Sequence, residues 1–545
     1  MSKSTVKFID EKTGRHRFVH HGQVENAPNI VLITIDMVSP DFYLPSRRLA
    51  GEIDMPAFKA LQRDSVVFQN AFSLVPLCGP SRAILLTGRY TYVLGNGEHA
   101  PDGVETEVRA DDVIFPEYLK RIGYATKHVG KCHVGTEKFM HAFGENDCPW
   151  NQWYPPIFQD EGYVEYQRRL GVKPQKYSKE IVFLQGDRVT SGNSAGGWIV
   201  QDDGKPFPLE AQYSQFLAKR AEEKIDHALS SPKTRGQPIY LQLDIFDPHQ
   251  PFSVPDGYSR REKELRAMMT LPKTYEKTVV QDWAPFEDQP EVYDLYRRYW
   301  GLYNPQSVLD YRVANALQME VVDAALSRVI RSLKERDLYD NSMILVMSDH
   351  GEMNGRWGLV DKGVYLYPDV MRTPLVIKPP SSMGISPRTV TAPVSLLDVA
   401  PTVLSMAGVE PEARLDGQSL IPYLREEFVP VDRDMIFSCG WHVGINFACG
   451  IQRWDNKGNH HLYAFNASSD VDELYDLNKE EAENLAQDGV HAKLKVEMIE
   501  RLGAVLQADT RWGGYYGPFR LAKFSHLPKS PGSMQKSEEL DLMTR

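Results

Sequence analysis

The sequence LCGPSRAILLTGRY, at residues 77–90, places a thiol and an arginine close enough to contact one anion, with a proline between them. Pro80 suits the first turn of a helix, so we expect Cys78 to lie at a helix N-terminus. Free backbone N–H groups and the helix dipole favour anions at that end. Arg82 follows about one helical turn later, and its side chain can point back at the same place. The spacing therefore predicts an anion-binding site centred on Cys78.

Acidic and imidazole side chains stand directly after three short apolar runs. The runs and their final polar residues are PNIVLITID with Asp36, PIYLQLDIFDPHQPF with Asp247 and His249, and SMILVMSDHG with Asp349 and His350. Runs of this kind are typical of buried parallel strands. Because ligands of open α/β sheets gather at the carboxyl ends of the strands, we expect these side chains to lie along one edge.

The segments around these runs predict an α/β fold. Val322, Leu326, Val329 and Leu333 recur at spacings of four, three and four, which indicates an amphipathic helix. A second helical pattern, PVSLLDVAPTVLSMAGV, ends at Gly408. Strands that alternate with helices imply a mainly parallel sheet flanked by helices.

Composition divides the chain into four expected parts: an N-terminal arm at 1–27, a large domain at 28–424, a smaller subdomain at 425–510 and a tail at 511–545. The subdomain begins where strand-like pieces such as MIFSCG and INFACGIQRW replace the helical patterns. The tail has no core periodicity, so we expect it to pack on a neighbour or to be partly mobile. The stretch 150–215 lacks a clear period, which favours a long insertion near a substrate pocket over a core element.

The bulk composition excludes several classes of protein. The chain has 545 residues, of which 42% are hydrophobic and 25% charged, and no uncharged apolar run is long enough to cross a membrane. The first residues form no secretory signal, so a cytoplasmic location is the expectation. The net charge of -11, without a basic run, argues against nucleic-acid binding. Five cysteines are too few for a disulfide framework, and no C-x-x-C pair suggests a zinc site.

Residues 77–90 match, residue for residue, the signature that sulfatases present for formylglycine formation. The match is carried by Cys78, Pro80, Ser81, Arg82, Thr87, Gly88 and Arg89. The chain thus resembles the type I, formylglycine-dependent arylsulfatases of the alkaline phosphatase superfamily, close to the phosphonate monoester hydrolases. The resemblance spans roughly residues 28–490. It implies an alkaline phosphatase-like, mainly parallel sheet flanked by helices in a sulfatase catalytic domain, with a smaller C-terminal α+β subdomain.

The resemblance also implies the site. One divalent metal, Ca²⁺ or Mn²⁺, would be held by Asp36, Cys78 as formylglycine, Asp349 and His350. The residues around the sulfate would be Cys78, Arg82, Lys131, His133, His249 and Lys362. Arg82, Lys131 and Lys362 would hold sulfate oxygens as preorganised cations. Either His249 or His133 would protonate the leaving alcohol, and a second histidine would act as the base.

The implied reaction is the hydrolysis of sulfate monoesters, aryl sulfates above all. One hydroxyl of the formylglycine hydrate would attack sulfur, and loss of the proton of the other would expel sulfate. The implied partners are a small-molecule sulfate ester, the formylglycine-generating enzyme during maturation, and further copies of the chain in a homo-oligomer. Neither nucleic acid nor a membrane is expected.

Two positions depart from the sulfatase pattern. Many sulfatases follow the first acid with a second, whereas Met37 follows Asp36 here, and a thioether is a poor ligand for hard ions. Asp41 or water would have to replace the missing ligand, although we favour Asp41 as the cap of the following turn. His350 stands where many sulfatases carry Asn and phosphonate hydrolases carry His, which shifts metal preference from calcium towards manganese.

The Lys131-Cys132-His133 run resembles sulfatases and is absent from the phosphonate hydrolases, so sulfate esters are the first interpretation. We expect Cys132 to be a packing residue. The first alternative is a phosphonate monoester or phosphodiester hydrolase of the same superfamily. The second is a catalytically silent protein that binds oxyanions, and Met37 is the one feature that favours it. A mutase or alkaline phosphatase would need more metal ligands and a serine or threonine nucleophile in place of Cys78.

Overall fold

The structure is a computed structural model, and it describes residues 5–8, 18–21, 27–90, 108, 113–144, 160–256, 258–363, 365–411, 415–427, 433–439, 448–455, 457–466, 471–479, 482–509, 519–520 and 522–523. Part of the C-terminal tail thus lies outside the described residues, as do Cys148 and residues 150–159 of the expected insertion.

A central sheet of eight strands organises the described part of the chain. Its order is β12-β4-β11-β10-β3-β8-β5, and β13 also pairs with β4. The strands are β3 (Asn29–Ile35), β4 (Val66–Phe72), β5 (Ala125–Gly130), β8 (Ile239–Ile245), β10 (Ser342–Ser348), β11 (Arg372–Lys378), β12 (Arg388–Val390) and β13 (Val394–Ser395). The pairs β10–β3, β3–β8 and β8–β5 are parallel, whereas β11 runs antiparallel to both neighbours. The strands β3, β5, β8 and β10 are buried along their whole length, which explains the long apolar stretches of β3 and β10.

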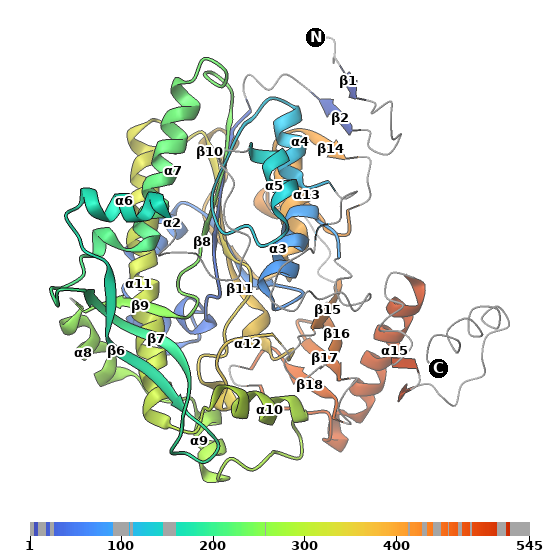
Figure 1. Cartoon of the computed structure of the whole chain (residues 1–545). Helices are drawn as coiled ribbons and strands as arrows, with labels where there is room; N and C mark the ends of the chain where they lie inside the picture. The colour runs from blue at the N-terminus through green and yellow to red at the C-terminus, as the bar shows by residue number, and fades with distance from the viewer. Residues whose placement is uncertain are drawn as a thin grey trace, which may run out of the picture.

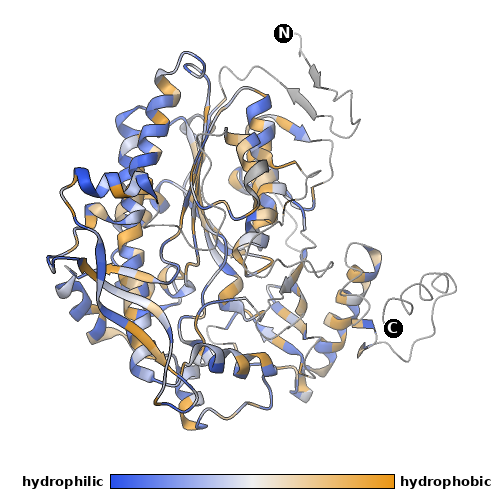
Figure 2. Ribbon diagram, viewed as in Figure 1, coloured by the Kyte–Doolittle hydropathy of each residue, from blue (hydrophilic) through white to orange (hydrophobic). Residues whose placement is uncertain are grey.

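Helices cover both faces of this sheet (Figure 1). On one side lie α2 (Pro56–Arg63), α7 (Tyr213–Ser230) and α11 (Pro305–Glu335), and on the other α3 (Cys78–Thr87), α4 (Phe115–Arg121), α5 (Thr136–Phe143) and α13 (Val399–Met406). Figure 2 shows mostly hydrophobic residues on α13 and more hydrophilic ones on α6 (Glu161–Arg169), at the periphery. The predicted α/β class with a mainly parallel sheet is therefore confirmed. The predicted amphipathic helix is the C-terminal part of the longer α11.

Short elements connect these layers. They are η2 (Pro40–Phe42), α1 (Arg48–Glu52), η4 (Leu209–Ala211), α8 (Ser259–Met268), α9 (Lys273–Val280), α10 (Glu291–Trp300), η5 (Arg356–Gly358), α12 (Pro368–Met371), η6 (Ser381–Met383), η7 (Leu396–Asp398), α14 (Ile421–Leu424) and η8 (Gly489–His491). Near the N-terminus, β1 (Thr5–Phe8) pairs with β2 (Phe18–His21), and β2 pairs with β14 (Val409–Pro411). The expected N-terminal arm thus adds two strands to a small sheet.

The described part of the expected insertion forms regular structure. After α6, β6 (Gln175–Leu184) and β7 (Ser191–Gln201) form a hairpin, and β7 pairs in parallel with β9 (Phe252–Pro255). Register shifts interrupt the hairpin, and a Cβ at Gly196 would lie 2.3 Å from backbone atoms of Phe252. The close approach requires glycine, and the irregular register conceals the two-residue period that would predict strands.

A smaller antiparallel sheet follows the main domain. It contains β15 (Arg433–Cys439), β16 (Ala448–Trp454), β17 (His460–Asn466) and β18 (Glu473–Asp476), and α15 (Ala492–Ala508) packs against it through Met498 and Leu502. The predicted C-terminal α+β subdomain is confirmed. Part of the tail packs here as well, because Phe519 is buried in the same cluster and Lys523 lies 2.5 Å from Asp472.

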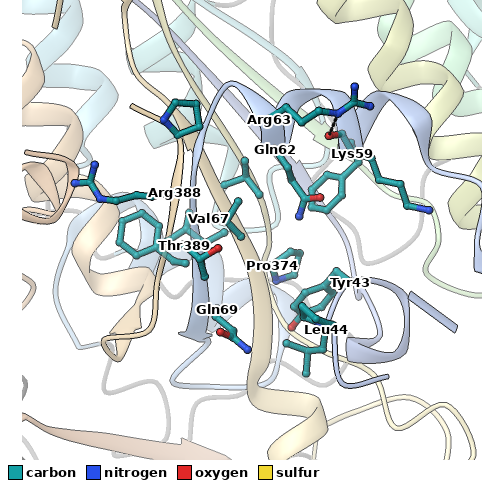
Figure 3. Close-up of a pocket in the computed structure, with 16 residues that line it drawn as sticks. Tyr43, Leu44, Lys59, Gln62, Arg63, Val67, Gln69, Pro374, Arg388 and Thr389 are labelled. Carbon is teal, nitrogen blue, oxygen red and sulfur yellow. Dashed lines mark hydrogen bonds between the residues drawn. The ribbon is translucent and has the colours of Figure 1, made fainter. Parts of the chain in front are cut away.

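One cavity of about 410 Å³ lies beside α2 and the strands β4 and β11 (Figure 3). Apolar side chains such as Val67 and Pro374 share its wall with the cationic Lys59, Arg63 and Arg388. Arg388 is already paired with Glu426 at 3.0 Å. None of the residues expected in the site lines this cavity.

No helix in the described ranges combines the length and the apolar character needed to span a lipid bilayer.

A buried ion pair joins the C-terminal sheet to the main domain. Both oxygens of Asp398 accept hydrogen bonds from the guanidinium of Arg433, at 2.8 and 2.7 Å. The backbone amides of Ser395 and Gln418 also donate to this carboxylate. The pKa of Arg433 is raised, because Asp398 outweighs the opposing effect of burial.

We predict that Asp398→Ala destabilises the protein by about 3–5 kcal/mol, because it leaves the Arg433 charge buried without its partner. The measurement is the midpoint of thermal unfolding. Arg168→Ala is the matched control, since Arg168 forms its pair with Glu165 at the surface, with 73% of its side chain exposed. Equal midpoints for the two variants would contradict the prediction.

Candidate active site

The carboxyl ends of the central strands bring four of the predicted residues together. Asp36 follows β3, Asp349 and His350 follow β10, and Cys78 begins α3. One potential ligand atom from each of these four buried residues lies within 4.8 Å of the others. Neighbouring parallel strands that end together explain the meeting, since 313 residues separate Asp36 from Asp349 in the sequence.

The donor chemistry of this group fits a divalent cation. His350 Nδ1 donates to the backbone oxygen of Gly351 at 3.0 Å, which leaves Nε2 3.5 Å from Asp36 and able to act as a ligand. Burial and the nearby charge of Asp36 raise the pKa of Asp349. Two buried carboxylates this close repel each other, and a bound cation would relieve the repulsion.

The surroundings of Cys78 favour negative charge. Cys78 is buried at the first position of α3, and its Sγ lies 3.2 Å from His350 Nε2. Burial alone would raise the pKa of the thiol, but Lys131, Lys362 and His350 outweigh it, and the pKa lies well below its ordinary value. His133 also hydrogen-bonds to Cys78. An anionic atom on residue 78 is therefore stabilised, chiefly by these neighbouring charges.

Arg82 faces carboxylates rather than open space. Its Nε donates to Asp349 at 2.9 Å, one Nη donates to Asp244 at 3.0 Å, and the other lies 3.5 Å from Asp36. Only 2% of Arg82 is exposed. The expectation that Arg82 holds sulfate oxygens differs from this geometry, in which the guanidinium contacts Asp36 and Asp349. Asp36, Cys78, Asp349 and His350 are the candidate metal ligands, and we call them the metal group.

Lys131 and His133 follow β5 at the same edge. Lys131 Nζ donates to Asp36 at 2.7 Å and lies 5.4 Å from the ring centre of Phe246. The pKa of His133 is lowered, chiefly by burial, which keeps its imidazole neutral and able to accept a proton. Cys132, between them, is buried in the main hydrophobic cluster, so the expectation of a packing residue is confirmed.

His249 and Lys362 approach the group from two loops. His249 Nδ1 donates to the backbone oxygen of Gln250 at 2.6 Å, and His249 Nε2 accepts from Lys362. Lys362 is also 3.1 Å from Asp361. Although burial opposes it, Asp361 and Cys78 raise the pKa of Lys362, so this side chain remains a cation.

Met37 leaves the metal group one carboxylate short, but its backbone is used. Met37 has a positive φ of 57°, which non-glycine residues rarely adopt, and its amide donates to Asp349 at 3.2 Å. Asp41 is not part of the group, because its carboxylate pairs with Arg356 at 2.8 Å and Arg312 at 3.2 Å. The interpretation of Asp41 as a turn cap is wrong, since Ser39 supplies the cap.

Two residues behind Arg82 are missing from the sequence-based site. Asp244, near the end of β8, contacts Arg82, and its second oxygen lies 2.7 Å from His128 Nε2 on β5. A signal for Asp244 exists in the sequence, because polar residues at alternate positions interrupt the apolar run IYLQLDI. His128 stands next to Lys127 without a local pattern that would mark it.

Comparisons with known proteins find a family model that covers most of the chain. A family model described as "Sulfatase" matches residues 28–409, and one described as "N-sulphoglucosamine sulphohydrolase, C-terminal" matches residues 355–508. The uncharacterized sulfatase YidJ from Escherichia coli (strain K12) is 25% identical over 66% of this chain, and the match spans 64% of that relative. An arylsulfatase from Clostridium perfringens is 25% identical over 73% of this chain and 79% of its own length.

A solved structure extends the comparison to the fold. The phosphonate monoester hydrolase SpPMH from Silicibacter pomeroyi matches with a TM-score of 0.66 and 21% identity, over 88% of this chain and 95% of that chain. At this identity the likeness concerns the fold, including the parallel sheet on which the metal group is built.

We predict that Asp349→Asn weakens Mn²⁺ and Ca²⁺ binding by roughly 10-fold or more, because it removes a charge from the metal group. Isothermal titration calorimetry measures the affinity. Asp323→Asn is the control, since Asp323 is also a buried acid but accepts from the amides of Ala57 and Phe58 at the start of α2. Unchanged Mn²⁺ and Ca²⁺ affinity in Asp349→Asn would mean that Asp349 is not a metal ligand.

Proposed function

Because the chain belongs to the sulfatase family, we propose that it hydrolyses sulfate monoesters, aryl sulfates above all, with a formylglycine made from Cys78 and one divalent metal. The observation that carries the proposal is the joint placement of Cys78, two carboxylates and His350 within 4.8 Å, beside the cations Lys131 and Lys362. The sulfuric ester hydrolase class follows from the family, and the aryl preference is the finer proposal.

The position of Cys78 Sγ stands for the oxygen atoms that residue 78 would carry after oxidation and hydration. A formylglycine hydrate supplies a hydroxyl nucleophile and a second hydroxyl whose deprotonation releases sulfate, and a metal supplies positive charge beside them. Asp36, Asp349 and His350 are the side chains that would hold the metal. The low pKa of the Cys78 thiol supports this use of the site, because the same cations would stabilise an ionised oxygen there.

Lys131 and Lys362 are the proposed sulfate-binding cations. Both are buried, and both lower the pKa of Cys78, which supports this assignment. Preorganised cations of this kind stabilise the charge that develops on a tetrahedral anion in the transition state. Arg82 is a positioning residue in this proposal, since carboxylates and the Lys131 carbonyl occupy its donors.

The two histidines are assigned different roles. His133 hydrogen-bonds to residue 78, so we assign it as the base for the hydroxyl proton. His249 receives a hydrogen bond on Nε2 from Lys362, while its Nδ1 is fixed on the Gln250 backbone. We therefore assign the His249–Lys362 pair as the source of the proton for the leaving alcohol.

A phosphonate monoester hydrolase is the second candidate, and His350 is the observation that favours it. An imidazole in the metal group is the feature in which the sequence resembles those enzymes, and a phosphonate monoester hydrolase shares the fold. The buried Lys131, which pairs with Asp36, favours the sulfate ester.

We predict that a formylglycine-generating enzyme of the host converts Cys78, because the motif around Pro80 and Arg82 matches its target. Conversion replaces the thiol by an aldehyde and lowers the mass of the Cys78 peptide by ~18 Da. Peptide mass spectrometry measures the change. Cys78→Ala should abolish turnover, whereas Cys449→Ala, a change at a buried thiol in the C-terminal cluster, should retain it. Active protein whose Cys78 peptide carries only the thiol would refute the conversion.

We predict that Lys131→Ala lowers kcat/KM for an aryl sulfate by roughly 10²-fold or more, the usual effect of losing one preorganised charge. His133→Ala should also lower sulfate turnover, and activity on an aryl phosphonate should fall less in both variants. The rates are compared at one metal concentration. A wild-type preference for the phosphonate, or unchanged sulfate turnover in both variants, would replace the sulfatase proposal by the phosphonate one.

A further inference from the structure

Asp244 is a buried acid that lies outside the metal group yet connects to it. Its Oδ1 accepts from Arg82 at 3.0 Å, and its Oδ2 accepts from Gln242 Nε2 at 2.8 Å and faces His128 Nε2 at 2.7 Å. The residue has no exposed surface. All of these partners are side chains of the central sheet or of α3, so Asp244 is held from three sides.

His128 fixes the second oxygen of Asp244. The Asp244 carboxyl has a lowered pKa, because Arg82 and His128 outweigh the effect of burial, so it accepts hydrogen bonds as a carboxylate. His128 Nε2 must therefore carry the proton that points at Asp244. The imidazole ring packs edge-on against Phe139, with ring centres 4.6 Å apart, which limits its rotation.

Asp244 balances the positive charge of Arg82, which lies next to the metal group. Arg82 lies within 3.5 Å of both Asp36 and Asp349, the two carboxylates of the metal group. A positive charge so close to a cation site opposes the binding of a second positive charge, and low-dielectric surroundings strengthen this repulsion. Asp244 sits on the same guanidinium at 3.0 Å and supplies the balancing negative charge without occupying the metal group.

Asp244 also positions Lys131 through the backbone. The Asp244 carbonyl accepts from the Lys131 amide at 3.2 Å, and Arg82 donates to the Lys131 carbonyl at 3.0 Å. The strands are so close that a Cβ at Gly130 would lie 2.0 Å from the Asp244 carbonyl oxygen. Asp244, Arg82 and Lys131 thus form one closed set of contacts.

We propose that Asp244 and His128 are positioning residues that neutralise and orient Arg82, and that they thereby set the cation affinity of the metal group and the placement of Lys131. The part that concerns Lys131 rests on the proposed function, whereas the part that concerns cation affinity does not depend on the substrate.

The first test compares Asp244→Asn with Tyr240→Phe in the full chain. Tyr240 is a buried member of the same strand whose hydroxyl donates to Gln242 at 2.8 Å, one step farther from Arg82. Calorimetric titration with Mn²⁺ should show roughly 10- to 100-fold weaker binding in Asp244→Asn, the range typical of outer-shell partners, and less than about 2-fold change in Tyr240→Phe. Equal Mn²⁺ affinities in wild type and Asp244→Asn would overturn the proposal.

The second test uses His128 and stays informative if Asp244→Asn does not fold. His128→Leu removes the donor to Asp244, and His128→Gln restores an N–H of similar reach. We measure Mn²⁺ affinity, and we determine kcat and KM for an aryl sulfate as separate values. Mn²⁺ affinity and kcat should fall in the leucine variant and recover in the glutamine variant. Equal losses in both variants would indicate a merely structural residue and would overturn the proposal.

The outcomes separate this proposal from the proposed function. If Asp244→Asn weakens Mn²⁺ binding while the wild type cleaves no sulfate ester, the positioning proposal stands and the sulfatase proposal fails. If the wild type cleaves the sulfate ester and the Asp244→Asn and His128→Leu variants retain full Mn²⁺ affinity, the sulfatase proposal stands and the positioning proposal fails.

Discussion

The buried guanidinium of Arg82 is the interaction on which the site depends. It lies 2.9–3.5 Å from carboxylates of Asp349, Asp244 and Asp36, which follow or end three different strands. Lys131 brings a second buried cation to the same acids, since its Nζ lies 2.7 Å from Asp36. An uncompensated buried charge is costly. The carboxylates therefore offset the buried cations, and Asp36 and Asp349 would also balance the charge of a divalent metal held between them.

The fold explains how these charges come to be buried together. Fully buried strands β3, β8 and β10 run in parallel, and their carboxyl ends place the acids on one edge. The N-terminus of α3 brings Cys78 to that edge, with Arg82 one turn later on the same helix. The antiparallel strand β11 and the C-terminal sheet, held through Asp398 and Arg433, complete the domain around it. Apolar burial thus supplies the stability that the polar site does not.

Much of this arrangement is predictable from the sequence, for physical reasons. The buried strands β3 and β10 are largely apolar, so the acid that follows each of them, Asp36 or Asp349, is conspicuous in the sequence. The proline at position 80 marks the helix that carries Cys78. By contrast, the role of Asp41 depends on Arg312 and Arg356, which lie 271 and 315 residues away. The contact of His128 with Asp244 is equally non-local, and the irregular hairpin of β6 and β7 hides its period behind register shifts.

The most direct test of the account is anomalous diffraction at the manganese edge from crystals of the full chain grown with Mn²⁺. The account predicts one strong anomalous peak among the carboxylates of Asp36 and Asp349, the imidazole of His350 and residue 78. Well-ordered crystals with these four side chains in contact and no peak between them, or with manganese bound only elsewhere, would contradict it.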